Sequence, residues 1–338
     1  MVVVMGAGAH EEQVAAVVEV VERAGGSAFV SRGVERTIIG LVGDVELFLG
    51  LNLQALAGVA DVVRISAPYK LVSRDHRPVT STISVGGVPI GPGTFAFIAG
   101  PCAVESREQT LEAAAMAKAA GAVLLRGGAF KPRTSPYAFQ GLGARGLEIL
   151  VEAREATGLP IVTEVVDAAD VPLVAEHADM LQIGARNAQN FGLLQAVGGT
   201  ARPVLLKRGL TATYEEWLMA AEYIAQRGNL NIVLCERGVR SFEPAIRNML
   251  DVSAVPMVHA LSHLPIVVDP SHAAGRRDLV VPLARAAIGA GADGVMVDVH
   301  PRPEVALCDG PQALFGEELA RLADAVRDRV HTGGTRTP

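Results

Sequence analysis

LPIVVDPSHAAGRRDLVVPLARAAIGAGADGVMVDVH, at residues 264–300, holds two short apolar strands joined by a loop and a helix. The same order of strand, loop and helix recurs eight times between about residue 93 and residue 330. The strands are continuously hydrophobic, which is typical of a parallel sheet covered by helices. Eight such units predict an α/β fold of the (β/α)8 TIM barrel type. The predicted strands end near Gly100, Arg126, Glu164, Gly184, Lys207, Glu236, Asp269 and Asp298.

A smaller unit precedes the barrel. Its strands and helices follow the order βαββαβ, which predicts a ferredoxin-like domain. Its first helix places Val14, Val17, Val18 and Val21 on one apolar face. A second helix is expected over 45–56. The predicted parts of the chain are a ferredoxin-like regulatory domain at 1–70, a linker and β-hairpin at 71–92, the catalytic barrel at 93–330 and a disordered tail at 331–338.

The composition restricts the classes of partner. With 30 basic and 36 acidic side chains the net charge is −6, which argues against nucleic-acid or anionic-membrane binding, because that binding rests on clustered positive charge. The chain contains no run of about 18 uncharged apolar residues, so no membrane-spanning helix is predicted. The first residues do not read as a secretion signal, so we expect a cytoplasmic protein. Three cysteines cannot form a disulfide framework, so each is expected to be a buried thiol, a nucleophile or a metal ligand.

Two glycine patterns are not interpreted as nucleotide sites. GAG at residues 6–8 follows a strand and opens a helix, but Glu11 takes the place of the third glycine and would repel a pyrophosphate. GLGARG at residues 141–146 lies far beyond the strand that precedes it. An anionic ligand is therefore expected to need a local basic pocket.

Basic side chains gather at the predicted mouth of the barrel, where catalytic groups lie in this fold. A phosphate needs several charge-assisted donors, and arginine forks also fix its orientation. The alternative for any one of them is surface solvation or an ion pair with Glu164 or Glu236. Together they predict a pocket for two phosphates, or for a phosphate and a carboxylate. These residues are Arg126, Lys131, Arg133, Arg186, Lys207, Arg208 and Arg237.

A second set of side chains offers metal ligands. Cys102, His272, Asp298 and Asp309 follow the first, seventh and eighth predicted strands, with His300 nearby. Thiolate, imidazole and carboxylate donors together suit Zn, Fe, Mn or Co rather than Mg. Their spacing is no signature, and Cys102 alone could be a packed thiol. Taken jointly, the four residues predict a divalent metal site.

Lys131 and Lys207 allow a different chemistry, because either amine could form a Schiff base as in barrel aldolases. Such an amine must first lose its charge. Both lysines have an arginine within two residues, which favours a role in binding anions.

Several segments of the chain match a known family. They are IAGPCAVES (98–106), LRGGAFKPRTSPYAFQGLG (125–143), LQIGARNAQN (181–190), LLKRG (205–209), LCERG (234–238), VDPSHAAGRR (268–277) and VMVDVHPRPEVALCDGPQAL (295–314). Over nearly its whole length the chain resembles 3-deoxy-D-arabino-heptulosonate 7-phosphate (DAHP) synthases of the type Iβ group. That family condenses phosphoenolpyruvate with erythrose 4-phosphate and releases phosphate, the first step of the shikimate pathway to aromatic amino acids.

The resemblance implies roles for the site residues. Lys131, His272 and Cys102 would be catalytic, and Arg133 with Thr134 would hold the phosphate of the aldose. It also implies a homotetramer and an aromatic amino acid effector at the N-terminal domain. Phosphoenolpyruvate would be held by Arg126, Lys131, Arg186, Lys207 and Arg237, and a divalent metal ion (Mn, Fe, Zn or Co) by Cys102, His272, Asp298 and Asp309.

Three residues depart from the usual pattern of that family. Asp298 stands where glutamate is usual, and its shorter side chain draws the carboxylate back by about 1.5 Å, so that either the strand end shifts, a water intervenes or the ligand is lost. Cys308 stands where serine is common and offers a substitute thiolate, so we expect a retained metal with altered preference. Phe29 stands where feedback-inhibited relatives commonly have histidine, so weak or absent inhibition by tyrosine is expected. These departures leave open a paralogue with another phosphorylated aldose, and a non-catalytic pathway partner.

Overall fold

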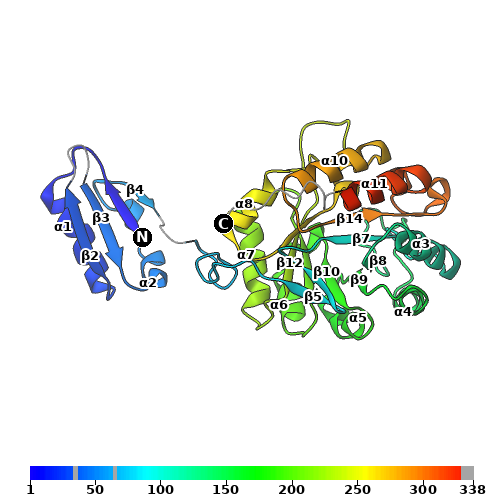
Figure 1. Ribbon diagram of the computed structural model, residues 1–338. Helices are drawn as coiled ribbons and strands as arrows, with labels where there is room; N and C mark the ends of the chain where they lie inside the picture. The colour runs from blue at the N-terminus through cyan, green and yellow to red at the C-terminus, as the bar shows by residue number, and fades with distance from the viewer. Residues whose placement is uncertain (33–36, 64–66, 329–338) are drawn as a thin grey trace. The chain divides into compact units, whose positions relative to one another are not determined.

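The chain forms two compact units, Met1–Pro68 and Tyr69–Pro338 (Figure 1). A computed structural model describes residues 1–32, 37–63 and 67–328. The predicted tail at 331–338 lies outside these described ranges. Each unit has a sheet of its own.

The N-terminal unit is a four-stranded antiparallel sheet with the strand order β2-β3-β1-β4. Its elements are β1 (Val2–Met5), α1 (Glu11–Arg23), β2 (Ser27–Arg32), β3 (Thr37–Val42), α2 (Val45–Leu49), a 3-10 helix (Leu53–Ala55) and β4 (Val59–Val63). The order and the sheet confirm the predicted ferredoxin-like plan. The single helix predicted over 45–56 is wrong, because α2 ends at Leu49, with Gly50 as its C-cap, and a separate 3-10 helix follows.

The apolar face of α1 packs against this sheet. Val14, Val17 and Val21 are buried in one cluster with Val3 and Ile39 of the strands, while Val18 is only partly buried at its edge. The helix is therefore stabilised by burial of one stripe, as its residue spacing predicts.

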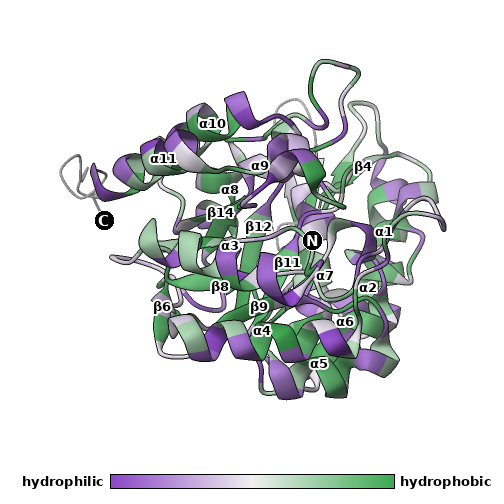
Figure 2. Ribbon diagram, turned by 90° about the vertical axis from the view of Figure 1, so that its right-hand side faces the viewer, coloured by the Kyte–Doolittle hydropathy of each residue, from purple (hydrophilic) through white to green (hydrophobic). Residues whose placement is uncertain are grey.

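The C-terminal unit is a closed eight-stranded parallel barrel, as predicted, with helices around its outside (Figure 1). The ring closes between β14 and β7, where Asp298 pairs with Gly100. The strands are hydrophobic, and the surrounding helices mix hydrophobic and hydrophilic residues (Figure 2). The strands are β7 (Ala96–Gly100), β8 (Leu124–Arg126), β9 (Ile161–Glu164), β10 (Met180–Ile183), β11 (Val204–Lys207), β12 (Ile232–Glu236), β13 (Ile266–Val268) and β14 (Gly294–Asp298). The helices are α3 (Arg107–Ala119), α4 (Ala144–Thr157), α5 (Val171–His177), α6 (Phe191–Gly198), α7 (Tyr214–Ala225), α8 (Ala254–Leu261), α9 (Pro270–Ala274), α10 (Arg277–Gly289) and α11 (Gly316–Asp328).

The predicted hairpin closes one end of this barrel. It consists of β5 (Ile83–Val85) and β6 (Val88–Ile90), whose Ile83, Val85 and Ile90 are buried together with residues of the barrel interior. Its turn at Gly86 lies against Pro160, directly before β9. The hairpin therefore covers the end at which the strands begin, and the other end remains for the site.

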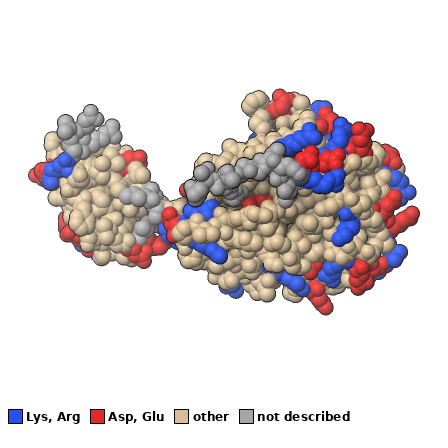
Figure 3. All heavy atoms as spheres, in the orientation of Figure 1, with Lys and Arg blue, Asp and Glu red and all other residues tan. Residues whose placement is uncertain are grey.

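The surface of the barrel unit carries both signs of charge. On the face seen in Figure 3, basic and acidic side chains lie interspersed. Within the described ranges, no helix is both long enough and apolar enough to cross a lipid bilayer. Against this mixed surface, a group of cations without neighbouring acids would indicate a binding site for an anionic ligand.

Gly100 ends β7 at a position that only glycine fits. Its φ is 154°, and a Cβ there would lie 2.1 Å from the carbonyl oxygen of Arg126 on the neighbouring strand β8. The chain turns from this residue into Cys102, so the close approach of the two strands also places that sulfur at the barrel mouth.

We predict that Gly100→Ala destabilises the barrel by about 1–3 kcal/mol, because overpacking forces β7 and β8 apart. The free energy of unfolding from urea titration is the measurement. Gly289→Ala, at a helix end where a Cβ meets no other atom, is the matched control and is expected to be neutral. Equal stability of the two variants would contradict the packing argument.

Candidate active site

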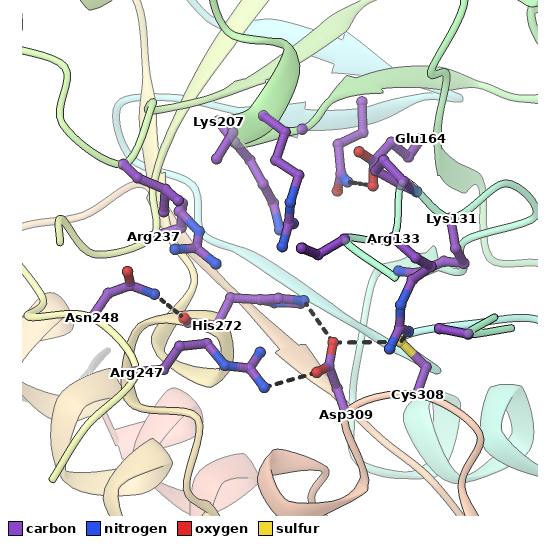
Figure 4. A pocket seen from close by; sticks show the side chains of 18 of the residues that line it. Lys131, Arg133, Glu164, Lys207, Arg237, Arg247, Asn248, His272, Cys308 and Asp309 are labelled. Atoms are coloured by element: carbon purple, nitrogen blue, oxygen red, sulfur yellow. Dashed lines mark hydrogen bonds and ion pairs between the residues drawn. The ribbon is translucent and has the colours of Figure 1, made fainter. Parts of the chain in front are cut away.

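A cavity of about 530 Å³ opens at the C-terminal ends of the barrel strands (Figure 4). Its walls come from β8 and the loop after it, from the ends of β10 to β12, from α9 and from the loop after β14. Cations dominate these walls, since Glu164 and Asp309 are the acids among the lining residues. The lining cations are Arg126, Lys131, Arg133, Arg186, Lys207, Arg237, Arg240 and Arg247.

Two of the predicted cations are fixed by buried acids. Arg126 contacts Asp298, and the ammonium of Lys207 donates to Asp269 Oδ2 at 2.6 Å. Both acids are fully buried. For these two cations the acidic partners are aspartates rather than Glu164 or Glu236.

Arg208 does not belong to the cavity, although the sequence placed it at the mouth. Its guanidinium donates to Glu236 at 3.0 Å and to Asp251 at 2.8 Å, and it lies 4.5 Å from the centre of the Tyr214 ring. It follows Lys207 in the chain and turns outward, so its charge is used in the structure around the barrel rather than on a ligand.

Three other arginines face the cavity without an acid. We call Arg186, Arg237 and Arg240 the cavity arginines. Among the described residues, no carboxylate lies within 4.0 Å of any of their guanidinium groups. Arg237 is buried, and its Nη1 finds no hydrogen-bond partner among those residues. Burial lowers the pKa of Arg237, which marks an uncompensated charge. A buried cation without a partner is costly, so this group of side chains is built for an anionic ligand.

The four predicted metal ligands lie together at the edge of the cavity. One donor atom from each of Cys102, His272, Asp298 and Asp309 lies within 4.8 Å of all the others, and we call this set the metal cluster. His272 Nε2 is 3.7 Å from Cys102 Sγ and 3.8 Å from Asp309 Oδ2. Soft and hard donors in one such set fit a divalent transition metal.

Local structure sets the orientation of the imidazole. Asp269 Oδ1 accepts a hydrogen bond from the backbone N–H of His272 at 2.9 Å and so caps α9. Its Oδ2 lies 2.8 Å from His272 Nδ1, although out of line for a hydrogen bond. Nδ1 therefore faces the cap and Nε2 faces the metal cluster. Burial lowers the pKa of His272, which favours the neutral form that binds metals.

Asp309 is held ready in its ionised form. Burial alone would raise its pKa, but the nearby His272 and Arg247 lower it far below the ordinary range. The Arg247 guanidinium donates to Asp309 Oδ1 at 2.9 Å, which leaves Oδ2 toward Cys102 at 3.1 Å. Asp309 has a φ of 56°, a left-handed conformation that is unusual outside glycine and common at functional sites.

Lys131 links the cations to the metal cluster. Its ammonium donates to the carbonyl oxygen of Cys102 at 2.9 Å and lies 3.2 Å from the sulfur. Burial lowers the pKa of this ammonium, but the Cys102 and Cys308 sulfurs outweigh burial and raise it. The amine therefore keeps its proton, which argues against a Schiff base at Lys131.

The remaining predicted residues have mixed outcomes. Thr134 lines the cavity, and Arg133 donates to Cys308 Sγ at 2.6 Å. His300 lies outside the metal cluster and pairs with Glu105 at 3.3 Å. Sequence reasoning missed Arg240 and Arg247, which line the cavity from the long loop after β12. Their only signal was the length of that loop, since no strand end lies beside them.

The fold and this site define a class: a (β/α)8 barrel enzyme with a cationic cavity beside a group of side chains that could hold a metal ion. The family comparisons make the assignment specific. The profile described as "DAHP synthetase I family" matches residues 54–332, and the one described as "DAHP synthase ferredoxin-like domain" matches residues 1–67. The chain belongs to the DAHP synthetase I family.

Individual relatives agree with this assignment. The chain is 52% identical over 338 residues to a phospho-2-dehydro-3-deoxyheptonate aldolase of Thermotoga maritima, covering 98% of this chain and 100% of that protein. A crystal structure of a Thermotoga maritima protein with that name, also called DAHP synthase, superimposes with a TM-score of 0.90 at 51% identity over 98% of this chain and 97% of the other. A 2-dehydro-3-deoxyphosphooctonate aldolase of a Geobacter species is 33% identical over 264 residues, covering 72% of this chain and 95% of that protein.

We predict that Arg237→Met weakens the binding of inorganic phosphate by about 10-fold to 100-fold, since hydrogen bonds to charged groups contribute about 1.5–3 kcal/mol. Without phosphate, the same variant is expected to be as stable as the original or more so, because the uncompensated buried charge is gone. The measurement is the rise of Tm with phosphate concentration. Arg145→Met, at an exposed residue of α4, is the control. Undiminished phosphate stabilisation in Arg237→Met would exclude Arg237 as an anion contact.

Proposed function

We propose that this chain condenses phosphoenolpyruvate with erythrose 4-phosphate to form DAHP and inorganic phosphate. The observation that carries the proposal is the meeting of the cavity arginines and the metal cluster around one cavity. Membership of the DAHP synthetase I family and the full-length match to the Thermotoga maritima protein support it.

Phosphoenolpyruvate would bind through its phosphate and its carboxylate. The cavity arginines offer guanidinium forks that suit either group. Lys207, fixed by Asp269, and Arg126, fixed by Asp298, add charge at the floor of the cavity. The charges of Lys207 and Arg126 are already neutralised by these aspartates, so the two cations would mainly orient the ligand. The cavity arginines would neutralise most of the negative charge that the ligand brings. The proposed phosphoenolpyruvate-binding residues are Arg126, Lys131, Arg186, Lys207 and Arg237.

The second substrate would enter over the loop between β8 and α4. Arg133 and Thr134 from this loop line the cavity and would hold the phosphate of erythrose 4-phosphate. Arg133 contacts a sulfur rather than a carboxylate, so a phosphate can replace this contact at little cost. This arrangement places the aldehyde end of the aldose toward Lys131 and the metal cluster.

Carbon–carbon bond formation would then occur between C3 of the enol and C1 of the aldehyde. Lys131 holds its proton at Nζ and delivers it to the aldehyde oxygen, which becomes a hydroxyl group. Water adds at C2 and gives one proton back to the Lys131 amine. The bond from C2 to the phosphate oxygen then breaks, the C2 hydroxyl passes its proton to the departing phosphate, and C2 becomes the ketone carbon. The surrounding cations stabilise the negative charge that both substrates bring into the cavity.

The donor set of the metal cluster fits a divalent ion such as Mn, Fe, Zn or Co. Cys102, His272, Asp298 and Asp309 would hold it. When bound, it supplies a Lewis acid that polarises the aldehyde oxygen. The neutral imidazole of His272 and the ionised carboxylate of Asp309 are already in the forms that coordinate metals.

Two alternatives are less well supported. A paralogue that uses another aldose phosphate would share the phosphoenolpyruvate site, and the phosphooctonate aldolase relatives show that related chains carry other names. Those relatives match only 72% of this chain, whereas the heptonate aldolase matches both units. A non-catalytic partner would have no need to maintain a buried Arg237 whose Nη1 has no hydrogen-bond partner among the described residues.

Regulation is assigned to the N-terminal unit. We propose that an aromatic amino acid acts there, that the enzyme is a cytoplasmic homotetramer, and that tyrosine is a weak effector. Phe29 on β2 has 67% of its surface exposed and offers no polar partner for a ligand hydroxyl.

The assay that tests the function is phosphate release from phosphoenolpyruvate in the presence of erythrose 4-phosphate, compared with other aldose phosphates. We expect erythrose 4-phosphate to be preferred, and Lys131→Met to lower kcat by about 10²-fold to 10⁴-fold because the proton donor is lost. Arg145→Met is the matched control with unchanged kcat. Preference for another aldose would favour the paralogue, and no turnover with any aldose would favour the non-catalytic partner.

Metal removal gives an independent prediction. Dialysis against a strong chelator is expected to release a divalent metal ion and to abolish activity, and readdition of Mn, Fe, Zn or Co should restore it. Metal content and rate are measured on the same sample. Full activity in a dialysed sample, with no metal detected before or after dialysis, would refute the metal-dependent mechanism.

A further inference from the structure

Cys308 lies beside the metal cluster without being one of its four residues. Its sulfur is 3.5 Å from Cys102 Sγ and 3.5 Å from Asp309 Oδ2. The side chain is 4% exposed, and it borders the cavity. Cys308 belongs to a small buried cluster with Cys102 and Ala103, which is separate from the cluster that fills the barrel interior, so its sulfur lies beside the candidate ligands rather than in the main core.

We propose that Cys308 is itself a ligand, so that the divalent ion is held by two sulfurs, Cys102 and Cys308, together with His272 and Asp309. This inference rests on the metal site of the proposed function and changes its composition. The set becomes two thiolates, one imidazole and one carboxylate, which is a combination that favours Zn and other soft divalent ions.

Five of the six distances between the four proposed donor atoms lie near the values of a single tetrahedral site. Bonds of about 2.3 Å to sulfur and about 2.0–2.1 Å to nitrogen and oxygen require donors about 3.3–3.8 Å apart. The two sulfurs are 3.5 Å apart, and Cys102 Sγ is 3.7 Å from His272 Nε2 and 3.1 Å from Asp309 Oδ2. Asp309 Oδ2 is 3.5 Å from Cys308 Sγ and 3.8 Å from His272 Nε2. Small side-chain adjustments bring all of these edges to the required range.

Asp298 is the donor that this arrangement releases. Its Oδ1 contacts Arg126, and its Oδ2 accepts a hydrogen bond from Gln312 Nε2 at 2.5 Å. Both oxygens therefore already have strong partners, and the carboxylate is fully buried at the end of β14. Coordination by Asp298 would compete with these contacts. Among the described residues, the sulfur of Cys308 contacts Arg133 and two members of the same proposed ligand set, Cys102 and Asp309.

The contact between Arg133 and Cys308 is compatible with ligation. An N–H donor 2.6 Å from the sulfur stabilises a thiolate, and ligating groups commonly accept hydrogen bonds from a second residue. The same guanidinium lies in the cavity, where it can also reach the aldose phosphate.

The test compares cobalt-loaded wild type, Cys308→Ser and Cys235→Ala. Each thiolate bound to Co²⁺ adds near-ultraviolet charge-transfer absorbance, so Cys308→Ser should show about half the absorbance per bound cobalt of the wild type. Cys235 is buried in the barrel interior away from the cluster, so Cys235→Ala should match the wild type. Zinc-loaded samples should show two sulfur neighbours at about 2.3 Å by X-ray absorption in the wild type and one in Cys308→Ser.

Folding is monitored by Tm, and Cys308→Ala repeats the measurement without a hydroxyl that could itself coordinate. Unchanged absorbance per cobalt in both Cys308 variants, or one sulfur neighbour in the wild type, overturns the proposal. Condensation activity of the same wild-type sample separates the two claims. An active wild type with one sulfur ligand overturns only the role of Cys308, whereas two sulfur ligands without condensation overturns only the proposed function.

Discussion

The closure of the parallel barrel between β14 and β7 is the constraint on which the site depends. It pairs Asp298 with Gly100, two residues that lie almost two hundred positions apart in the chain, and so brings the start of the barrel beside its last strand. Because all strands run in the same direction, their C-terminal ends share one opening, and the residues after each end meet there. The hairpin β5–β6 covers the opposite end, which leaves this opening for ligands.

The cations around the opening fall into two groups, those paired with acids and those without an acidic partner. Asp298 and Asp269 compensate Arg126 and Lys207, and Glu236 with Asp251 compensates Arg208. The cavity arginines are left without such partners among the described residues. This division explains how a chain with a net charge of −6 offers a strongly cationic cavity. The acids are placed behind the cations rather than inside the cavity, so they fix the side chains without occupying the space for the substrate.

Much of the fold was readable because its signal is local. The continuous hydrophobic strands and their loops predicted all eight barrel strands, and the βαββαβ order predicted the small domain. The helix expected over 45–56 failed because a helical pattern does not show that Gly50 ends the helix. Arg208 was placed at the mouth because its neighbour Lys207 ends a strand, but successive residues point in different directions. Arg240 and Arg247 were missed because a loop carries no periodicity that tells where its side chains point.

The sequence by itself determined the architecture, the family and the residue types of the site, because hydrophobic periodicity and the matching segments are properties of the chain alone. The tertiary structure decided which cations have partners, which sulfurs lie together and which carboxylate is already engaged. Those are distances between residues brought close by barrel closure, and they depend on side-chain directions that no linear pattern contains. The relation of Cys308 to Cys102 is the clearest case, because 206 residues separate them in the chain and 3.5 Å separates their sulfurs in the fold.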